Sequence, residues 1–257
     1  MKKSSSMRVI GIIPARFGST RFPGKPLADI MGKTLIQRTY ENAKKCSALN
    51  DLVVATDDKR IFDHVKGFGG HVVMTSEECP TGTDRLAEVL KTDRTYDKSE
   101  IIINIQGDEP CLDTDVIKKV VEILENDPLA VMSTAIVELP RDEADNSSVV
   151  KCVIDKNHNA LYFSRALIPG GLTQKVQPHV HYYKHLGIYG YRREFLLHYS
   201  ELTPTPLMQA ESLEQLKVLE HGYRIKAAIV PHESVSVDLP EDIKKVELLL
   251  CKQNTSL

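Results

Sequence analysis

The chain has 257 residues, of which 42% are hydrophobic and 26% charged, and its formal net charge at pH 7 is −2. These values are ordinary for a soluble globular protein and allow one large α/β domain. The nearly neutral charge argues against a nucleic-acid partner, because such proteins carry a basic excess, and no apolar stretch is long enough to cross a membrane.

Short apolar segments alternate with helical patterns along the first half of the chain, and this alternation predicts a parallel sheet covered by helices. The expected strands cover residues 9–13, 52–56, 71–75, 101–105 and 130–137. The expected helices begin after the capping residue Thr34 and near Thr83, and a third covers residues 116–124.

The second half of the chain has a different order of predicted strands and helices. Two apolar segments, 149–155 and 160–165, flank the turn-rich sequence KNHN and predict a β-hairpin that leaves the main sheet. Further strands are expected at 185–191, 224–230 and 235–238, and further helices at 210–222 and from 240 towards 250. We therefore expect a flexible lead at residues 1–6 and a single domain at 7–257 that carries a small subdomain around 140–200.

The segment PARFGSTRFPGKP follows the first expected strand and gathers three cations, Arg16, Arg21 and Lys25, on a glycine-containing loop. Backbone N–H groups and cationic side chains in such a loop bind phosphate oxygens. The loop is no Walker P-loop, because five residues rather than four separate its glycines and Pro26 stands where a magnesium-binding Ser or Thr would be. The pattern favours a site for a small anion over a solvated surface loop.

Two aspartates are candidate metal ligands. Asp108 follows the expected strand 101–105, at the end where open α/β sheets bind ligands, and magnesium takes one or two carboxylates together with phosphate oxygens and water. Asp238 follows the expected strand 235–238 and precedes a helix start. The residues alone leave open a turn role for Asp108 and a capping role for Asp238.

A further pattern concerns ligand binding. The sequence TGTDR places Gly82 at a helix N-terminus, where a base or ribose could be bound, and the alternative is a capped helix with an exposed Arg85. In the expected strand 185–191, His185 and Tyr189 are four residues apart, so a regular strand would place them on one face, and both could simply be packed there.

Seven motifs resemble, in the same order, those of the cytidylyltransferases that activate 3-deoxy-manno-octulosonate (Kdo), the CMP-Kdo synthetases. The motifs are IIPARFGSTRFPGKPL, TGTDRLAEV, NIQGDEP, LYFSRALIP, HLGIYGY, LEQLKVLEHG and VSVDLPEDI. They run from about Val9 to Ile243, and although the first is shared with other nucleotidyltransferases, the combination is specific. The resemblance implies a Rossmann-like α/β nucleotidyltransferase fold with a mixed, mainly parallel sheet and a small hairpin-containing subdomain.

The resemblance also implies the reaction and its residues. CTP and Kdo would give CMP-Kdo and pyrophosphate for lipopolysaccharide biosynthesis, in a cytoplasmic homodimer that uses Mg²⁺ held by Asp108 and Asp238. The catalytic residues implied are Arg16, Lys25, Asp108 and Asp238. The CTP contacts implied are Arg16, Gly18, Ser19, Thr20, Arg21, Lys25, Gly82, Thr83, Arg85 and Gln106. The sugar contacts implied are Gln106, Arg165, His185, Tyr189, Glu214 and Gln215, of which Glu214 and Gln215 are expected in mid-helix.

Other functions stay open at this point. A related nucleotidyltransferase could act on sialic acid or on methylerythritol phosphate, and a panel of acceptors with CTP would distinguish these. A non-catalytic nucleotide sensor would bind CTP without releasing pyrophosphate. Five scattered cysteines without a CxxC pair indicate a reducing cytoplasm and no zinc framework.

Overall fold

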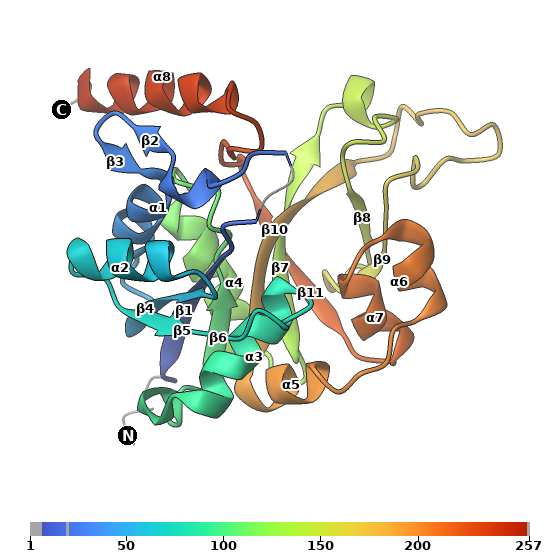
Figure 1. Ribbon diagram of the computed structural model, residues 1–257. Coiled ribbons are helices and arrows are strands. Elements are labelled where there is room, and N and C mark those ends of the chain that lie inside the picture. The colour runs from blue at the N-terminus through green and yellow to red at the C-terminus, as the bar shows by residue number, and fades with distance from the viewer. Residues whose placement is uncertain (1–6, 19–20, 256–257) are drawn as a thin grey trace, which may run out of the picture. The chain divides into compact units, whose positions relative to one another are not determined.

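The structure is a computed structural model that describes residues 7–18 and 21–255 (Figure 1). Its internal contacts divide the chain into two compact units, one of Met1–Lys118 with Ser234–Leu257 and one of Lys119–Glu233. The subdomain expected around 140–200 falls inside the second unit. The expected lead at 1–6 lies outside the described residues.

The described part of the first unit holds a parallel sheet with the strand order β6, β1, β4, β5. The strands are β6 (Ile101–Asn104), β1 (Val9–Ala15), β4 (Asp51–Thr56) and β5 (Val72–Met74). The β-branched runs of β1 and β6 are buried throughout, as expected for parallel strands covered on both faces. The parallel sheet predicted for the first half of the chain is therefore confirmed for four of its five expected strands, and the fifth, expected at 130–137, belongs to the mixed sheet of the second unit.

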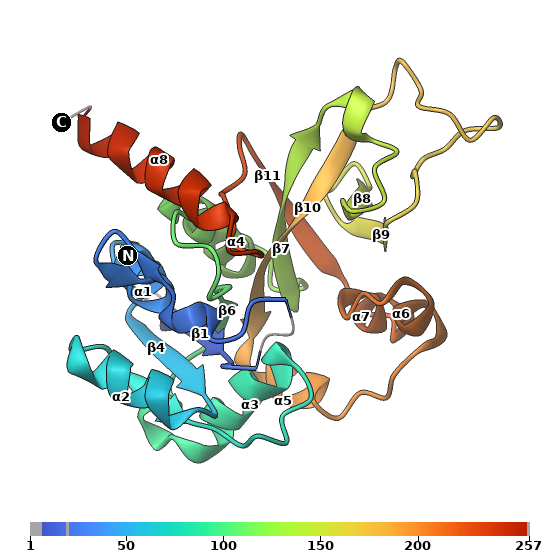
Figure 2. The same cartoon turned by 45° about the horizontal axis from the view of Figure 1, so that its top comes forward.

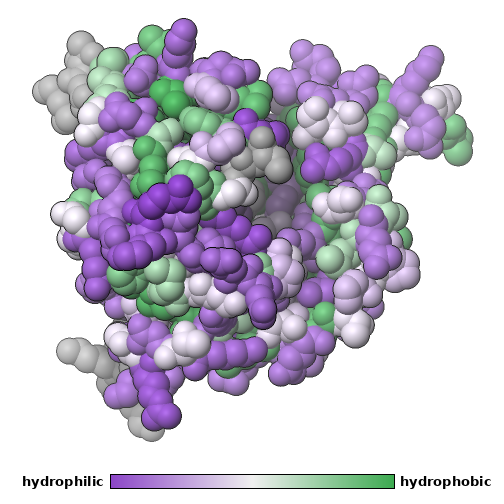
Figure 3. Space-filling view, in the orientation of Figure 1, coloured by the Kyte–Doolittle hydropathy of each residue, from purple (hydrophilic) through white to green (hydrophobic). Residues whose placement is uncertain are grey.

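Helices follow these strands and begin at capped residues. Thr34 accepts a hydrogen bond from the Gln37 N–H at the start of α1, and Thr81 does the same for the Asp84 N–H in α3. The helices of this unit are α1 (Leu35–Ala43), α2 (Lys59–Gly67), α3 (Gly82–Thr92), the first part of α4 (Thr114–Asn126) and α8 (Asp242–Thr255). Hydrophilic side chains gather over α2 (Figure 3), so this helix presents its charged face to solvent.

Short elements complete the first unit. They are the 3₁₀ turns η1 (Lys25–Leu27) and η2 (Arg94–Tyr96) and the strands β2 (Asp29–Ile30) and β3 (Lys33–Thr34). Ile30, Leu35, Val237 and Val246 form one buried cluster, which packs α8 beside the β2–β3 hairpin (Figure 2).

The second unit is built on a mixed sheet. Its strands are β7 (Met132–Leu139), β8 (Lys151–Ile154), β9 (Ala160–Ser164), β10 (Tyr182–Arg192) and β11 (Ile225–Val230). β7 pairs antiparallel with β10 and parallel with β11, while β8 pairs with β10 and β9. Asn159 also bridges to Lys226 on β11. The remaining elements are η3 (Arg141–Glu143), α5 (Arg193–Tyr199), α6 (Pro206–Glu211) and α7 (Gln215–Glu220).

The predicted β-hairpin at KNHN is confirmed as β8 and β9. The Asp155 carboxylate accepts hydrogen bonds from the N–H groups of Asn157 and Asn159, both at 2.8 Å, and His158 adopts a left-handed φ of 62°. Short polar side chains of this kind stabilise tight turns.

The helix predicted over 210–222 is wrong as a single element. Ser212 adopts a left-handed conformation with φ 54° and ends α6, and α7 begins afresh at Gln215. A left-handed residue cannot continue a right-handed helix, so the chain turns there. Glu214 is consequently the residue before α7 and Gln215 its first residue, not mid-helix positions.

The strand predicted at 235–238 is also wrong. The segment is irregular and forms no strand, although the Val237 N–H donates to the Asp108 carbonyl at 2.9 Å. This bond fastens the segment to the loop after β6 rather than to a neighbouring strand. Asp238 is therefore placed beside Asp108 by a loop contact. Over the described residues, we find no helix with the length and apolar character needed to traverse a bilayer.

Candidate active site

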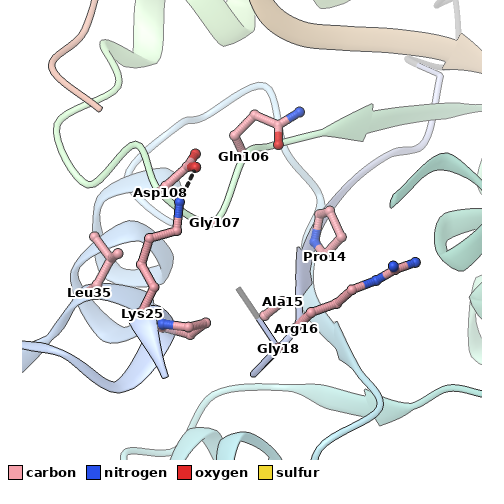
Figure 4. Close-up of a pocket in the computed structure, with 10 residues that line it drawn as sticks. Pro14, Ala15, Arg16, Gly18, Lys25, Leu35, Gln106, Gly107 and Asp108 are labelled. Carbon is pink, nitrogen blue, oxygen red and sulfur yellow. Dashed lines mark hydrogen bonds and ion pairs between the residues drawn. The ribbon is translucent and has the colours of Figure 1, made fainter. Parts of the chain in front are cut away.

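A pocket in the first unit lies where β1 and β6 end (Figure 4). Its cavity volume is about 200 Å³, and it is lined by Pro14, Ala15, Arg16, Gly18, Lys25, Pro26, Leu35, Gln106, Gly107 and Asp108. A Cβ atom on Gly107 would lie 3.1 Å from the Pro14 carbonyl oxygen, so this glycine permits a close approach of the two loops. The carboxyl ends of neighbouring parallel strands thus bring distant sequence motifs to one site.

Lys25 is the centre of the polar contacts in this pocket. Its ammonium group donates to Asp108 Oδ2 at 2.6 Å and to the Val237 carbonyl at 3.0 Å, and it lies 3.9 Å from Asp238 Oδ1. The preceding residue, Gly24, has φ 71°, and a Cβ there would meet the Phe17 ring at 3.0 Å. Only glycine fits this turn without strain, and the turn aims Lys25 at the two carboxylates.

The two loop arginines have different partners. Arg21 Nη2 lies 3.0 Å from Asp238 Oδ1, and both side chains are exposed. Arg16 Nη2 donates to the Cys79 carbonyl, and its side chain extends away from Asp108 (Figure 4). The structure therefore brings Lys25, Arg21, Asp108 and Asp238 together, and it places Gly18 and Gln106 on the same pocket. Ser19 and Thr20 lie outside the described residues.

In the sequence GTDR at the start of α3, Gly82 is partly exposed, whereas Thr83 and Arg85 are buried. Gly82 lies against Pro14, since a Cβ atom on this glycine would be 3.6 Å from the proline ring. Thr83 is buried. The guanidinium of Arg85 is 0% exposed and pairs with Asp57 at 2.5 Å while it also donates to Thr75. This placement contradicts the alternative in which Arg85 is exposed. It is also at odds with the direct nucleotide contact expected of Arg85, because the guanidinium is enclosed by protein.

Glu88 also shapes this site, although no motif predicted it. From the middle of α3, its carboxylate accepts hydrogen bonds from the Ser76 N–H at 2.7 Å and from the Cys79 thiol at 2.6 Å. Burial, together with the bond to Glu88, raises the pKa of Cys79 to about 11. Glu88 thus holds the loop whose Cys79 carbonyl receives Arg16. No local sequence signal marks a mid-helix glutamate for this task.

The carboxylates of Asp108 and Asp238 suit a magnesium ion. Each has an oxygen within 4 Å of the Lys25 ammonium nitrogen, so the two carboxylates are close together around Lys25. Among the described residues no group of three or more Asp, Glu, His or Cys side chains is arranged to hold a metal ion. Two carboxylates without a third fit magnesium, which keeps phosphate oxygens and water as its other ligands.

The predicted sugar contacts other than Gln106, which lines the pocket of the first unit, lie in the second unit. The rings of His185 and Tyr189, both on β10, have centroids 5.3 Å apart, and Phe163 of β9 meets His185 edge-on at 5.0 Å. Burial lowers the pKa of His185 to about 3. Burial, with smaller contributions from Tyr191 and Glu214, raises the pKa of Tyr189. Both side chains are therefore neutral at physiological pH.

Gln215 and Arg165 complete this group. Gln215 is only 4% exposed, and its Nε2 atom has no hydrogen-bond partner among the described residues. A buried amide without a partner is costly unless a ligand satisfies it. Arg165 is exposed just after β9, and its N–H donates to Glu211 Oε2 at 3.2 Å. Glu211, which no motif predicted either, accepts a second bond from the Ser164 hydroxyl at 2.6 Å.

Comparison with known proteins identifies the family. A family model described as cytidylyltransferase matches residues 10–226. The chain belongs to the cytidylyltransferase family. A relative from Protochlamydia amoebophila (strain UWE25), named 3-deoxy-manno-octulosonate cytidylyltransferase, is 61% identical over 251 residues, which are 97% of this chain and 97% of that protein.

Solved structures agree with this cytidylyltransferase assignment. A structure described as CMP:2-keto-3-deoxy-manno-octonic acid synthetase complexed with CTP is 39% identical and has a TM-score of 0.90, covering 96% of this chain and 99% of that one. A 4-diphosphocytidyl-2C-methyl-D-erythritol synthase from Anaerococcus prevotii, at 13% identity and a TM-score of 0.60, covers 95% of this chain and 99% of that one. The latter shares the fold alone. The predicted fold class and the family resemblance are confirmed.

Proposed function

We propose that this cytidylyltransferase couples CTP and Kdo to give CMP-Kdo and pyrophosphate. The observation that carries the proposal is Lys25 set between Asp108, in the loop after β6, and Asp238, in the loop fastened to it, in a chain 61% identical to a relative named for Kdo. A phosphate-binding cation flanked by two carboxylates is what nucleotidyl transfer requires, since the triphosphate must be neutralised and aligned.

The first unit supplies the groups for CTP. Arg16, Arg21 and Lys25 lie on or beside the pocket and would receive the phosphate oxygens. Lys25 pairs with Asp108, and Arg21 pairs with Asp238. A bound triphosphate would become the new partner of both cations, and the two carboxylates would then be available for a metal ion. Gly18 and Gly107 allow the phosphates a close approach to the backbone.

Asp108 and Asp238 would hold magnesium in this proposal. When bound, magnesium neutralises charge on the phosphate oxygens during the in-line displacement. The chain's own part is to keep both carboxylates beside Lys25. Asp108 is placed by the end of β6, and Asp238 by the Val237 N–H bond to the Asp108 carbonyl.

The second unit supplies the groups for the sugar acid. Arg165 carries the charge that suits the Kdo carboxylate. Neutral His185 and Tyr189, together with the unpartnered amide of Gln215, offer hydrogen bonds to hydroxyl groups. Glu214, next to Gln215, would accept a hydroxyl hydrogen bond. A set of residues with one cation and several neutral polar groups matches a polyhydroxylated acid.

The reaction is a direct displacement. The anomeric 2-hydroxyl oxygen of Kdo forms a bond to the α-phosphorus of CTP, and the bond from that phosphorus to the bridging oxygen breaks. The hydroxyl proton is released, and pyrophosphate leaves with the bond electrons. The residues position the reactants and stabilise charge, so no covalent enzyme intermediate is required.

Pyrophosphate release tests this function. The purified chain would be incubated with CTP and magnesium, with and without Kdo, and with sialic acid or methylerythritol phosphate as parallel acceptors. Release that depends on Kdo supports the proposal. Release with another acceptor alone would assign a different cytidylyltransferase activity, and CTP binding without release would indicate a nucleotide sensor.

Assembly and location are further proposals. We propose a homodimer, which light scattering on the purified chain would test, with a monomer at micromolar concentration as the contrary result.

We also propose a cytoplasmic location and a role in lipopolysaccharide biosynthesis. Cys46, Cys79, Cys111 and Cys152 are free thiols, which supports a reducing compartment, and cell fractionation would test the location.

A further inference from the structure

A buried threonine contacts His185 within the second unit. Thr134 lies on β7 and is 0% exposed. Its Oγ1 atom is 3.0 Å from His185 Nε2, and the same oxygen lies 2.8 Å from the Ile188 carbonyl and 3.3 Å from the Leu186 carbonyl. One hydroxyl therefore has three polar neighbours.

The chemistry of these neighbours fixes where the hydrogens are. A carbonyl oxygen only accepts, so the single hydroxyl proton of Thr134 is donated to the backbone, with Ile188 the nearer acceptor. The lone pairs of Oγ1 then accept from His185, and Nε2 must carry the hydrogen. Burial lowers the pKa of His185 to about 3, so the ring is neutral and its other nitrogen, Nδ1, has none.

The backbone of β10 creates this arrangement. In the pairing with β7, Leu186 lies opposite Ala135 and Tyr189 lies opposite Thr134, so residues 187 and 188 are an insertion in the ladder. The irregularity turns the carbonyls of Leu186 and Ile188 towards Thr134 instead of leaving them in a regular ladder. Bulges commonly re-aim groups in this way beside functional sites.

The ring of His185 is also held in orientation. Phe163 meets it edge-on, with an interplanar angle of 77°, and Tyr189 is a second ring neighbour, tilted by 36°. A ring enclosed by two aromatic neighbours does not turn freely to exchange its nitrogens. The hydrogen bond to Thr134 therefore selects one fixed arrangement of donor and acceptor.

We infer that Thr134 is a positioning residue that holds His185 as the Nε2–H tautomer, so that Nδ1 is a hydrogen-bond acceptor for a hydroxyl group of the sugar. The inference rests on the proposed function for its ligand. A carboxylate has no hydrogen to donate, so an unprotonated nitrogen would not bind it. His185 thereby selects a hydroxyl, and the sugar carboxylate is left to a cation such as Arg165.

Two substitutions separate the hydroxyl from the packing. Thr134→Val keeps the shape and removes the hydroxyl, while Thr134→Ser keeps the hydroxyl and removes a methyl group. The tautomer of His185 is read from ¹⁵N-histidine NMR, with His185→Asn used to assign the signal. We expect Nε2 protonated and Nδ1 unprotonated in the wild type and in Thr134→Ser, and a mixed or reversed tautomer in Thr134→Val.

Kinetics and ligand titration give the second readout. For Thr134→Val the KM for Kdo is expected to rise about three- to tenfold, the range for one hydrogen bond, with the KM for CTP unchanged. The KM for Kdo of Thr134→Ser should stay close to that of the wild type, because this variant keeps the hydroxyl. Addition of Kdo should shift the Nδ1 signal while leaving that nitrogen unprotonated, because it accepts from a hydroxyl.

Several outcomes would overturn the inference. They are a wild-type His185 protonated at Nδ1, an unchanged tautomer and KM in Thr134→Val, equal defects in both variants, or protonation of Nδ1 when Kdo binds. If Thr134→Val does not fold, the wild-type and Thr134→Ser spectra still decide the tautomer. Absence of any Kdo-dependent pyrophosphate release from the wild type would overturn the proposed function, whereas the spectra without ligand test the role of Thr134 independently.

Discussion

The rings of His185 and Tyr189 lie 5.3 Å apart, although four residues of a regular strand would span about 13 Å. The insertion in β10 explains the difference. His185 is opposite Ile136 and Tyr189 is opposite Thr134, and these partners are only two residues apart on β7. Because the insertion adds an even number of residues, both rings stay on one face. The two side chains can consequently contact a single small ligand.

Removal of the Asp108 charge should abolish most turnover. Asp108→Asn is expected to lower kcat by about 10²–10³-fold, the range for loss of one group that stabilises transition-state charge. The fold should persist, since the amide oxygen can still accept from Lys25. Steady-state kinetics over a magnesium titration and urea unfolding measure the two effects. Asp115→Asn, an exposed carboxylate paired with Lys118, is the control, and near-wild-type activity of Asp108→Asn would remove this residue from the site.

Loss of the Arg165 guanidinium should affect the sugar more than the nucleotide. Arg165→Ala is expected to raise the KM for Kdo by about 10- to 100-fold, as for a lost hydrogen bond to a charged group, and to leave the KM for CTP within about twofold. Initial rates with each substrate varied in turn measure this. The exposed Arg224 gives the control variant Arg224→Ala. Equal increases in both KM values would refute a sugar contact.

The ion pair of the buried Arg85 should contribute to stability. Arg85→Met leaves the Asp57 carboxylate, whose side chain is 16% exposed, without its partner, and the free energy of unfolding is expected to fall by about 3 kcal/mol, the lower end of the range for a buried pair. Arg60→Met removes an exposed guanidinium that pairs with Asp58, and because water solvates this arginine the change should cost no more than about 1 kcal/mol. Urea unfolding of both variants is the measurement. A small effect of Arg85→Met with a large rise in the KM for CTP would restore Arg85 as a nucleotide contact.

The low pKa of His185 predicts a pH-dependent stability. The folded protein keeps this imidazole neutral down to about pH 3, whereas the unfolded chain binds a proton near pH 6.5. The unfolded state therefore binds more protons below pH 6.5, and the contribution of His185 to stability is lost as the pH falls from there. Urea unfolding at pH 7.5 and 5.0 should show a smaller decrease for His185→Gln than for the wild type. Identical decreases would contradict the prediction.

Much of the first unit could be predicted from local sequence. The run VIGII, the cap at Thr34 and the helix start near Thr83 depend on a few neighbouring residues, and local patterns of this kind determine strands and helix starts. The placement of Asp108 after a buried strand was predictable for the same reason. The two elements predicted wrongly, 210–222 and 235–238, were changed by a left-handed Ser212 and by a loop contact to Asp108, which no pattern in those segments indicates.

The sequence by itself determined the family, the parallel sheet and the identity of the charged groups, because motif order and hydrophobic periodicity are properties of the chain. Only the tertiary structure decided how those groups are used. In the folded protein Arg85 pairs with Asp57, Glu88 accepts a hydrogen bond from the Cys79 thiol, and Thr134 contacts His185. Each of these contacts joins residues from different elements, and such contacts depend on packing and backbone irregularities that short-range sequence patterns do not specify.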